Sequence, residues 1–180
     1  MRARWTSGGL IVASLVLAAC GGRAPPAATA PAGPPPDAAA RAAAIEAAAA
    51  QLQKVDGRWQ RGQEPSRWSA YFQSGELRFL DERVTPPAGS ARHNRYYFEG
   101  GRLFYFAGEA PAGRLLGGPA ADAPTLPVQA EFSGARTISA VRIEHYGPVR
   151  LEERDATEIR RQATELASIA MGELRAVGTH

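Results

Sequence analysis

The side chains best suited to catalysis or metal binding are scattered along this 180-residue sequence. Its three histidines, His93, His145 and His180, are far apart, and none has a histidine four residues away or a cysteine at the spacing of a metal site. Metal sites and catalytic groups built on one element need such spacing. We therefore expect the histidines to lie in solvent or at strand edges, and we expect no metal and no cofactor.

Two mixed clusters of charge, Asp81-Glu82-Arg83 and Glu152-Glu153-Arg154, have the composition of strand ends and of segments that precede helices. General acid–base catalysis by one of these carboxylates would require burial and a second group close in space. The sequence also lacks a Gly-x-Ser-x-Gly motif, a phosphate-binding loop and a dinucleotide-binding fingerprint. We predict that the protein is not an enzyme, with an enzyme of unfamiliar type as the alternative.

Residues 1–19 have the features of a secretory signal peptide. Arg2 and Arg4 precede an apolar run at positions 10–19, and Cys20, the only cysteine of the chain, follows it. The run is about half of the roughly 20 residues that a membrane-spanning helix needs. With one cysteine no disulfide can form within the chain.

The segment Leu17-Ala18-Ala19-Cys20 resembles the lipobox of bacterial lipoproteins. The resemblance implies that the signal is cut before Cys20, which then carries a diacylglycerol and an amide-linked fatty acid such as palmitate. Such acyl chains would act as a membrane anchor. Gly21 is not the aspartate that favours inner-membrane retention in enterobacterial lipoproteins, so we expect the periplasmic face of the outer membrane. A plain signal peptide with an incidental cysteine is the alternative.

The charge of the mature chain gives no reason to expect nucleic acid as a partner. Loss of Arg2 and Arg4 leaves 19 basic and 18 acidic residues, a net charge of +1, against 21 and 18 in the whole chain. Lys54 is the only lysine, and we interpret the excess of arginine, with the many Ala, Gly and Pro residues, as the mark of a GC-rich genome.

Residues 20–36 consist of Cys20, the expected lipidation site, and a segment from Gly21 to Pro36 that contains six prolines and otherwise mainly Ala and Gly. Such a segment favours extended conformations and would reach about 50 Å at roughly 3.1 Å per residue. We interpret it as a tether. Residues 37–176 are then long enough for a single domain with one core.

The expected fold class of this domain is α+β: an N-terminal helix, an antiparallel meander of about six strands built from three hairpins, and a C-terminal amphipathic helix. Asp37 is the expected cap of a first helix over residues 38–54, which Gly57 would stop. The expected strands are residues 68–72, 77–84, 93–99, 102–107, 127–133 and 136–146. The last helix should begin at a capping box, Asp155-Ala156-Thr157-Glu158, and should bury Ile159, Ala163, Leu166, Ile169, Ala170 and Leu174.

Two of the hairpins share a pattern. Residues 71–79 align without a gap on residues 97–105, and residues 132–138 form a looser third copy. The pattern is similar to the Tyr-Tyr-x-x-Gly-x-Leu units of bacterial MORN-like hairpin repeats, which implies a scaffold or binding role. The alternative is ordinary hairpin chemistry that converges on the same residues.

Strict alternation along the aromatic hairpin would place its large side chains on both faces of the sheet. Tyr97, Phe104 and Phe106 would share one face, and Tyr96, Phe98, Leu103 and Tyr105 the other. The last helix should cover one face. Either the first helix covers the second face, or an aromatic patch there is left for a partner.

A second resemblance concerns recognition. Residues 90–96 and 103–110 are similar to the Ser-x-x-x-Tyr and Trp-x-x-Gly-x-x-Ala stretches of periplasmic lysozyme inhibitors, small lipid-anchored β proteins that insert a loop into an enzyme cleft. The cysteine pair common in that family is absent here. The resemblance makes Ser90, Arg92, Tyr96 and Tyr105 candidate binding residues. Independently, the Pro- and Gly-containing loops at 85–92 and 108–126 are candidate recognition loops, and a merely decorative insertion is the alternative for the second.

Together these features predict a lipid-anchored lipoprotein of the bacterial cell envelope, on the periplasmic face of the outer membrane. Its expected role is non-catalytic, in binding or in envelope assembly. Its expected partners are the membrane, through the anchor, and an envelope protein or peptidoglycan-associated machinery. A lysozyme-type inhibitor and an envelope enzyme of unfamiliar type are the alternatives.

Overall fold

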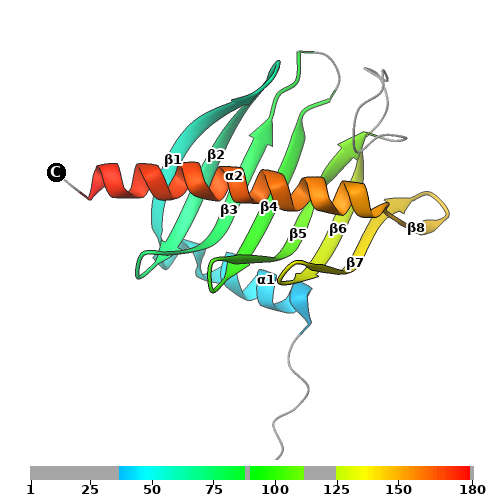
Figure 1. Ribbon diagram of the computed structural model, residues 1–180, viewed down its shortest axis with the longest axis horizontal. Coiled ribbons are helices and arrows are strands. Elements are labelled where there is room, and N and C mark those ends of the chain that lie inside the picture. Colours follow the sequence, from blue (N-terminus) through cyan, green and yellow to red (C-terminus); the bar gives the residue numbers. More distant parts are fainter. Residues whose placement is uncertain (1–36, 88–89, 112–124, 179–180) are drawn as a thin grey trace, which may run out of the picture. The chain divides into compact units, whose positions relative to one another are not determined.

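Eight antiparallel strands form one sheet in which every strand pairs with its neighbours in the sequence (Figure 1). The computed structural model describes residues 37–87, 90–111 and 125–178. The strands are β1 (Gln53–Arg61), β2 (Glu64–Gln73), β3 (Glu76–Val84), β4 (Arg92–Glu99), β5 (Arg102–Pro111), β6 (Thr125–Ser133), β7 (Arg136–Glu144) and β8 (Gly147–Arg150). The α+β class and the antiparallel meander are therefore confirmed, but the prediction of about six strands is wrong.

The strand missed at the start of the sheet, β1, explains why the first helix is shorter than expected. Helix α1 (Ala38–Ala48) is capped by Asp37, and a 3-10 turn (Ala49–Gln51) separates it from β1. Residues 53–61 pair along their whole length with β2, and Val55 is buried on the sheet. Gly57 does not stop a helix: it lies within β1, where a Cβ atom would meet the Trp68 ring at 2.1 Å.

The other missed strand, β8, lies at the opposite edge. The segment expected as one strand over residues 136–146 ends at Glu144, and the chain turns at His145 and Tyr146. Gly147 begins β8 with a φ angle of 121°, a conformation that glycine adopts without the steric cost of a side chain. The turn at His145 and Tyr146 therefore divides the expected last strand, and β7 and β8 form a hairpin.

The three predicted hairpin turns are present, and each hairpin carries the same irregularity. The register of the paired strands shifts between Tyr71 and Phe72, between Tyr97 and Phe98, and between Glu131 and Phe132. In the middle hairpin Tyr97 pairs with Tyr105 and Phe98 with Leu103, so Phe104 is the extra residue of a β-bulge. The kinship with MORN-like repeats stays a prediction.

This bulge corrects the assignment of aromatic side chains to faces. Phe104 and Tyr105 share one face with Tyr97, whereas Phe106 shares the other with Tyr96. Strict alternation had placed Tyr105 and Phe106 on the wrong faces, because an extra residue reverses the parity of all that follow it in the strand.

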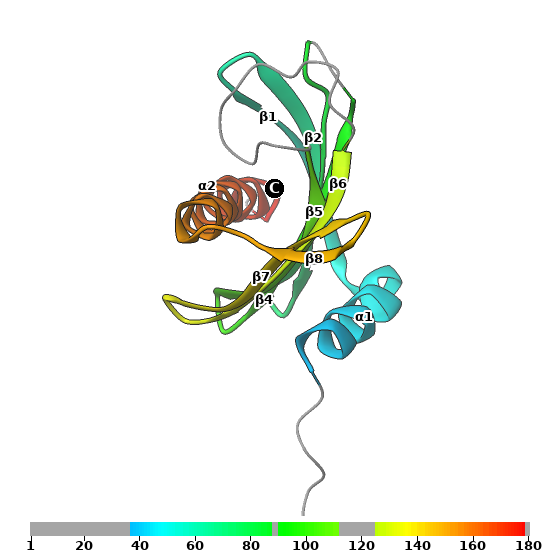
Figure 2. The same cartoon turned by 90° about the vertical axis from the view of Figure 1, so that its right-hand side faces the viewer.

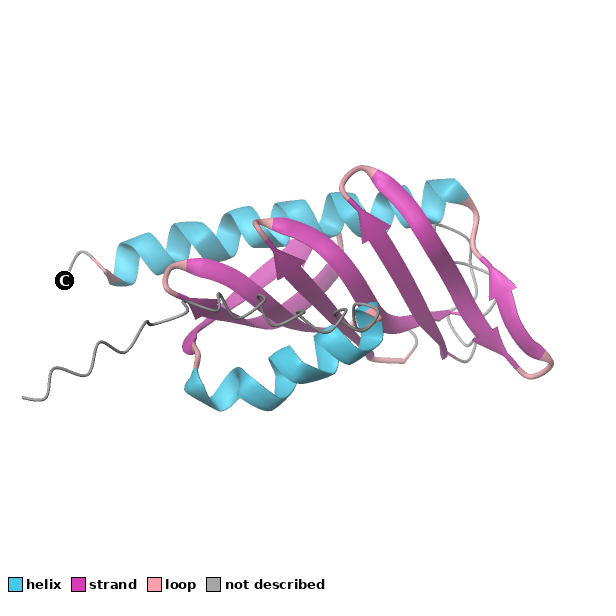
Figure 3. Cartoon of the chain, turned by 90° about the horizontal axis from the view of Figure 1, so that it is seen from below, coloured by secondary structure: helices cyan, strands magenta, loops and turns pink. Residues whose placement is uncertain are grey.

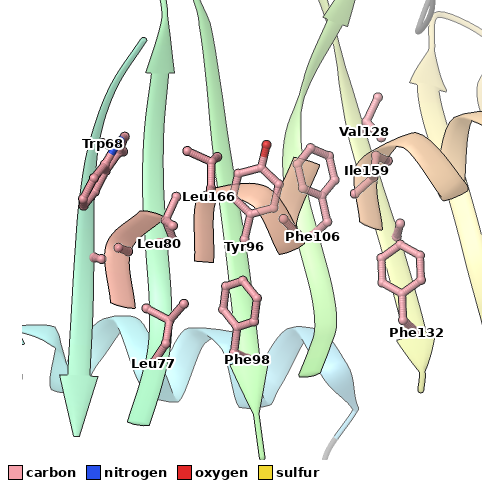
Figure 4. Close-up of a cluster of buried hydrophobic side chains, with 14 of the residues drawn as sticks. Trp68, Leu77, Leu80, Tyr96, Phe98, Phe106, Val128, Phe132, Ile159 and Leu166 are labelled. Carbon is pink, nitrogen blue, oxygen red and sulfur yellow. The ribbon is translucent and has the colours of Figure 1, made fainter. Parts of the chain in front are cut away.

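Helix α2 (Glu153–Val177) runs across one face of the sheet (Figures 1 and 2). Its buried stripe, which includes Ile159, Leu166 and Ala170, packs on the core formed by the sheet (Figure 4). The helix begins earlier than the predicted capping box: Glu152 is the N-cap residue and makes no side-chain cap hydrogen bond. Asp155, the expected cap, lies in the first turn of the helix.

Helix α1 lies on the opposite side of the sheet from α2 (Figure 3). Its Ala38 and Ala42 are buried against an aromatic cluster of Phe79, Tyr97, Phe104 and Tyr105. Arg41 stacks 4.4 Å from the centre of the Phe104 ring. The aromatic patch is thus covered by α1 instead of being left for a partner.

Glu46 fastens α1 to the sheet. It accepts a hydrogen bond from the Tyr97 hydroxyl and pairs with Arg95 at 2.8 Å. Burial, followed by the hydrogen bond to Glu46, raises the pKa of Tyr97 well above its ordinary value. The phenol therefore keeps its proton and stays a donor at neutral pH.

Candidate anion-binding face

Helix α1 covers only part of its face of the sheet. Its main contacts are with β3 and β5, and in Figure 2 it lies toward one end of the strands, which continue beyond it. On the uncovered part of this face, side chains from β1 to β4 are open to solvent. These strands carry the candidate site.

Four cationic or imidazole side chains stand in one line across these strands. Arg58 pairs directly with Arg67, Arg67 with Arg83, and Arg83 with His93. Trp68 and Glu82, which flank this line in sequence, are buried on the α2 side, so alternation directs the arginines to the α1 side. We call Arg58, Arg67 and Arg83 the arginine row.

The arginine row is exposed to solvent. Among the described residues, the ion pairs of the neighbouring arginines go elsewhere: Arg61 and Arg92 both pair with Glu64, at 3.2 and 2.8 Å. No such pair is formed by the row in the part of the chain that is described. Like charges placed directly opposite each other destabilise a sheet, so the row lowers the stability of this part of the sheet.

The row borders a shallow depression of about 390 Å³. Two carboxylates, Asp56 and Asp81, lie on the same depression beside Ser69. Asp56 accepts a hydrogen bond from the Ser69 hydroxyl at 2.5 Å and pairs with Lys54 at 2.9 Å. These two interactions, the first being the stronger, lower the pKa of Asp56. The Asp56 carboxylate is thus engaged by partners other than the arginine row.

Asp81 is engaged by the residue that ends the line. Its Oδ2 atom lies 2.9 Å from Nε2 of His93, and the two side chains are 26% and 38% exposed. The His93 backbone N–H donates to Glu109. A carboxylate beside an imidazole is the arrangement of a general base. The nearby Ser69 hydroxyl, opposite Asp81, is not activated by this pair, because it donates its hydrogen bond to Asp56 and not to His93.

A second polar cluster lies on the α2 side and is buried. Glu82, only 2% exposed, accepts hydrogen bonds from the Tyr96 hydroxyl at 3.0 Å and from Asn94 at 3.1 Å. Burial and the nearby Glu82 raise the pKa of Tyr96 well above its ordinary value. The adjacent cavity, lined by Asn94, Arg92 and Asp155, measures about 40 Å³. That volume suits ordered water, because ligand pockets measure roughly 300–1,000 Å³.

A larger depression of about 690 Å³ lies between α1 and the β2–β3 turn. It is lined by Ile45, Leu52 and Phe72 together with Arg41 and Glu99. Arg41 and Glu99 pair with each other at 2.7 Å. The charges at this depression therefore compensate each other, unlike those of the arginine row.

The candidate binding residues of the sequence are not brought together. Ser90 is exposed, whereas Arg92 points to the α2 side, pairs with Glu64 and has a side chain that is 15% exposed. Tyr96 and Tyr105 are 0% and 8% exposed and belong to the cores on opposite faces of the sheet. Both tyrosines serve packing here. Cys20 lies outside the described residues, so its lipidation stays a prediction.

The arginine row escaped the sequence analysis for two structural reasons. Residues 53–54 were expected to end a helix, and no strand was expected over residues 53–61, so Arg58 had no place in the sheet. The bulge in the first hairpin then shifts the register so that Arg67 meets Arg83 and not Glu82. A strand assignment for the alternating residues 53–61 would have been the signal for the row.

The chain matches no known family model, no curated protein and no solved structure. Among residues 37–87, 90–111 and 125–178, no helix has the length and apolar character that crossing a bilayer requires.

Proposed function

We propose that this protein is a lipid-anchored lipoprotein on the periplasmic face of the outer membrane, with a non-catalytic role in binding an anionic partner of the cell envelope. The observation that supports the binding role best is the uncompensated arginine row on an exposed face of the sheet. The anchor rests on the lipobox-like segment that ends at Cys20. The tether would allow the domain to reach a partner away from the membrane.

The binding role is tested with three forms of the full-length protein carrying a C-terminal tag. The row variant replaces Arg58, Arg67 and Arg83 by Gln. The control variant replaces Arg102, Arg136 and Arg150 by Gln, which removes the same charge from other exposed positions. Each form is crosslinked in its native envelope, purified and analysed by mass spectrometry, after its thermal unfolding has been shown to be cooperative.

We expect envelope components that are recovered with the wild type and the control variant and are lost with the row variant. Recovery of the same components from all three forms would contradict the role of the row. The anchor is tested separately by Cys20→Ala, which should abolish labelling with radioactive palmitate and move the protein out of the outer-membrane fraction. Retention there without labelling would contradict lipid anchoring.

An envelope enzyme is the second candidate, and one observation favours it: the Asp81–His93 pair ends the line of cations that the row begins. An imidazole held by a carboxylate beside bound anions could act as a general base. Hydrolysis of p-nitrophenyl phosphate by the wild type, lost in His93→Gln, would favour this candidate. No hydrolysis above the blank would favour binding alone.

The lysozyme-inhibitor hypothesis stays a prediction with its own test. Residual lysozyme activity is measured against increasing amounts of the wild-type protein and of a variant substituted at Ser90, Arg92 and Tyr96. Inhibition by the wild type that the variant lacks would support this hypothesis, and full lysozyme activity with the wild type would rule it out.

A further inference from the structure

We propose that the arginine row binds a discrete, soluble phosphorylated ligand through a group that carries at least two negative charges, such as a diphosphate. This inference rests on the proposed binding function and names the chemistry of the ligand. It follows from the pairing register of the three arginines, from the partners of the neighbouring carboxylates and from the composition of the surrounding surface.

The spacing favours phosphate over carboxylate. Directly opposed residues of antiparallel strands have Cα atoms about 4.5–5.5 Å apart, so the side chains of Arg58, Arg67 and Arg83 can converge on one group. A single guanidinium fork occupies both oxygens of a carboxylate. A phosphate or diphosphate group offers further oxygens to a second and a third fork, and the row supplies these forks.

The charge of such a ligand also matches the charge of the arginine row. Each of the two carboxylates on the depression already has partners: Asp56 has Lys54 and Ser69, and Asp81 has His93. The three arginines of the row have none among the described residues. A ligand with two or more negative charges would remove the repulsion between Arg67 and both of its neighbours, which a singly charged ligand cannot do.

The surrounding surface favours a discrete molecule over a lipid bilayer. Membrane-surface binding relies on apolar side chains beside the cations. The exposed large hydrophobic residues of the described chain are on or next to β7 and β8 and at the end of α2, and none is on β1 to β4: Ile138, Ile143, Tyr146, Val149 and Val177.

The test uses the full-length protein in a neutral detergent and isothermal titration calorimetry. The probe is pyrophosphate, and glutarate, a dicarboxylate, is titrated at the same ionic strength. We expect pyrophosphate to bind the wild type and the control variant (Arg102, Arg136 and Arg150 to Gln) equally. We expect its binding to the row variant to be weaker by on the order of tenfold or more, since charge-assisted forks are lost.

Three results would overturn the inference: equal pyrophosphate binding by all three forms, glutarate binding as tight as pyrophosphate binding, or no pyrophosphate binding by the wild type. A fourth result would also overturn it: row-dependent binding to phosphatidylglycerol vesicles that is stronger than binding to pyrophosphate. The phosphate groups that the row binds would then belong to a lipid surface and not to a soluble molecule. If envelope capture still depends on the row while pyrophosphate does not bind, the proposed function stands and only the phosphate inference fails.

Discussion

Arg67 is the residue at which the electrostatic cost of the arginine row is concentrated, because it faces a like charge on each side. Opposed like charges destabilise a sheet by roughly 0.2–1 kcal/mol per pair. We predict that Arg67→Gln raises the free energy of unfolding by about 0.5–1 kcal/mol at low salt, measured by urea denaturation without phosphate. The gain should shrink as salt screens the repulsion.

Arg136, which is exposed and lies outside the row, provides the matched control. Arg136→Gln should leave the free energy of unfolding within about 0.5 kcal/mol of the wild type, as is usual for surface substitutions. If Arg67→Gln were destabilising, or if its effect grew with salt, the row would not be a site of uncompensated repulsion.

Asp155 gives a prediction that depends on pH. It is buried beneath the start of α2, its Oδ1 atom has no hydrogen-bond partner among the described residues, and this burial raises its pKa above the ordinary 3.8. The folded state therefore binds the proton more tightly than the unfolded state. The stability contributed by Asp155 is present at low pH and is lost as the pH rises through the raised pKa.

Asp155→Asn carries no such charge, so its stability relative to the wild type should increase between pH 3 and pH 7. Urea denaturation of both proteins at the two pH values measures this difference. A relative stability that is constant or that falls with pH would mean that Asp155 is not strained by its ionisation.

The sequence has no catalytic groups at close spacing, and on that ground it predicted a non-catalytic role, which stays a prediction. It could not place Asp81 against His93, because that contact depends on the pairing of β3 with β4. Nor could it separate Tyr96 from Tyr105, since the bulge at Phe104 decides their faces.

At the scale of elements, some parts of the fold can be predicted from the local sequence, whereas others depend on tertiary contacts. The hairpin turns follow from glycine: Gly100 and Gly101 both have positive φ angles, which the favoured two-residue turns require. The last helix follows from a clear apolar stripe. The boundary between α1 and β1 does not follow from the local sequence. The alanine-rich start favours a helix, and the pairing of β1 with β2 that competes with it is a tertiary effect.

Two glycines test the packing of these elements in opposite directions. In β1, Gly57→Ala would drive a Cβ atom into the Trp68 ring, and overpacking of this kind costs about 1–3 kcal/mol. In α2, a Cβ at Gly172 meets nothing within 4 Å, so Gly172→Ala should stabilise the protein by about 0.5–1 kcal/mol.

Urea denaturation of the two glycine variants beside the wild type measures both effects. Gly57→Ala should also shift the near-ultraviolet circular dichroism of its tryptophans, which Gly172→Ala should leave unchanged. A neutral Gly57→Ala would mean that β1 does not pack its backbone against Trp68.

At the scale of the whole molecule, the two helices of the domain lie on opposite faces of one sheet (Figure 3). The anchor and the tether that precede the domain are inferred from the sequence. Helix α1 leaves part of its face of the sheet uncovered, and the arginine row lies on that part. The sequence predicted the α+β class and the position of α2, while the edge strands β1 and β8 required the folded register.

The most direct test of the central claim separates the arginine row from the net charge of the protein. Wild type, row variant and control variant are loaded in neutral detergent on a phosphate-bearing cation-exchange resin and eluted with a salt gradient. The account predicts that the row variant elutes first, at clearly lower salt than the control variant, although both have lost the same three charges. Elution of the two variants together would contradict an anion-binding site at the row.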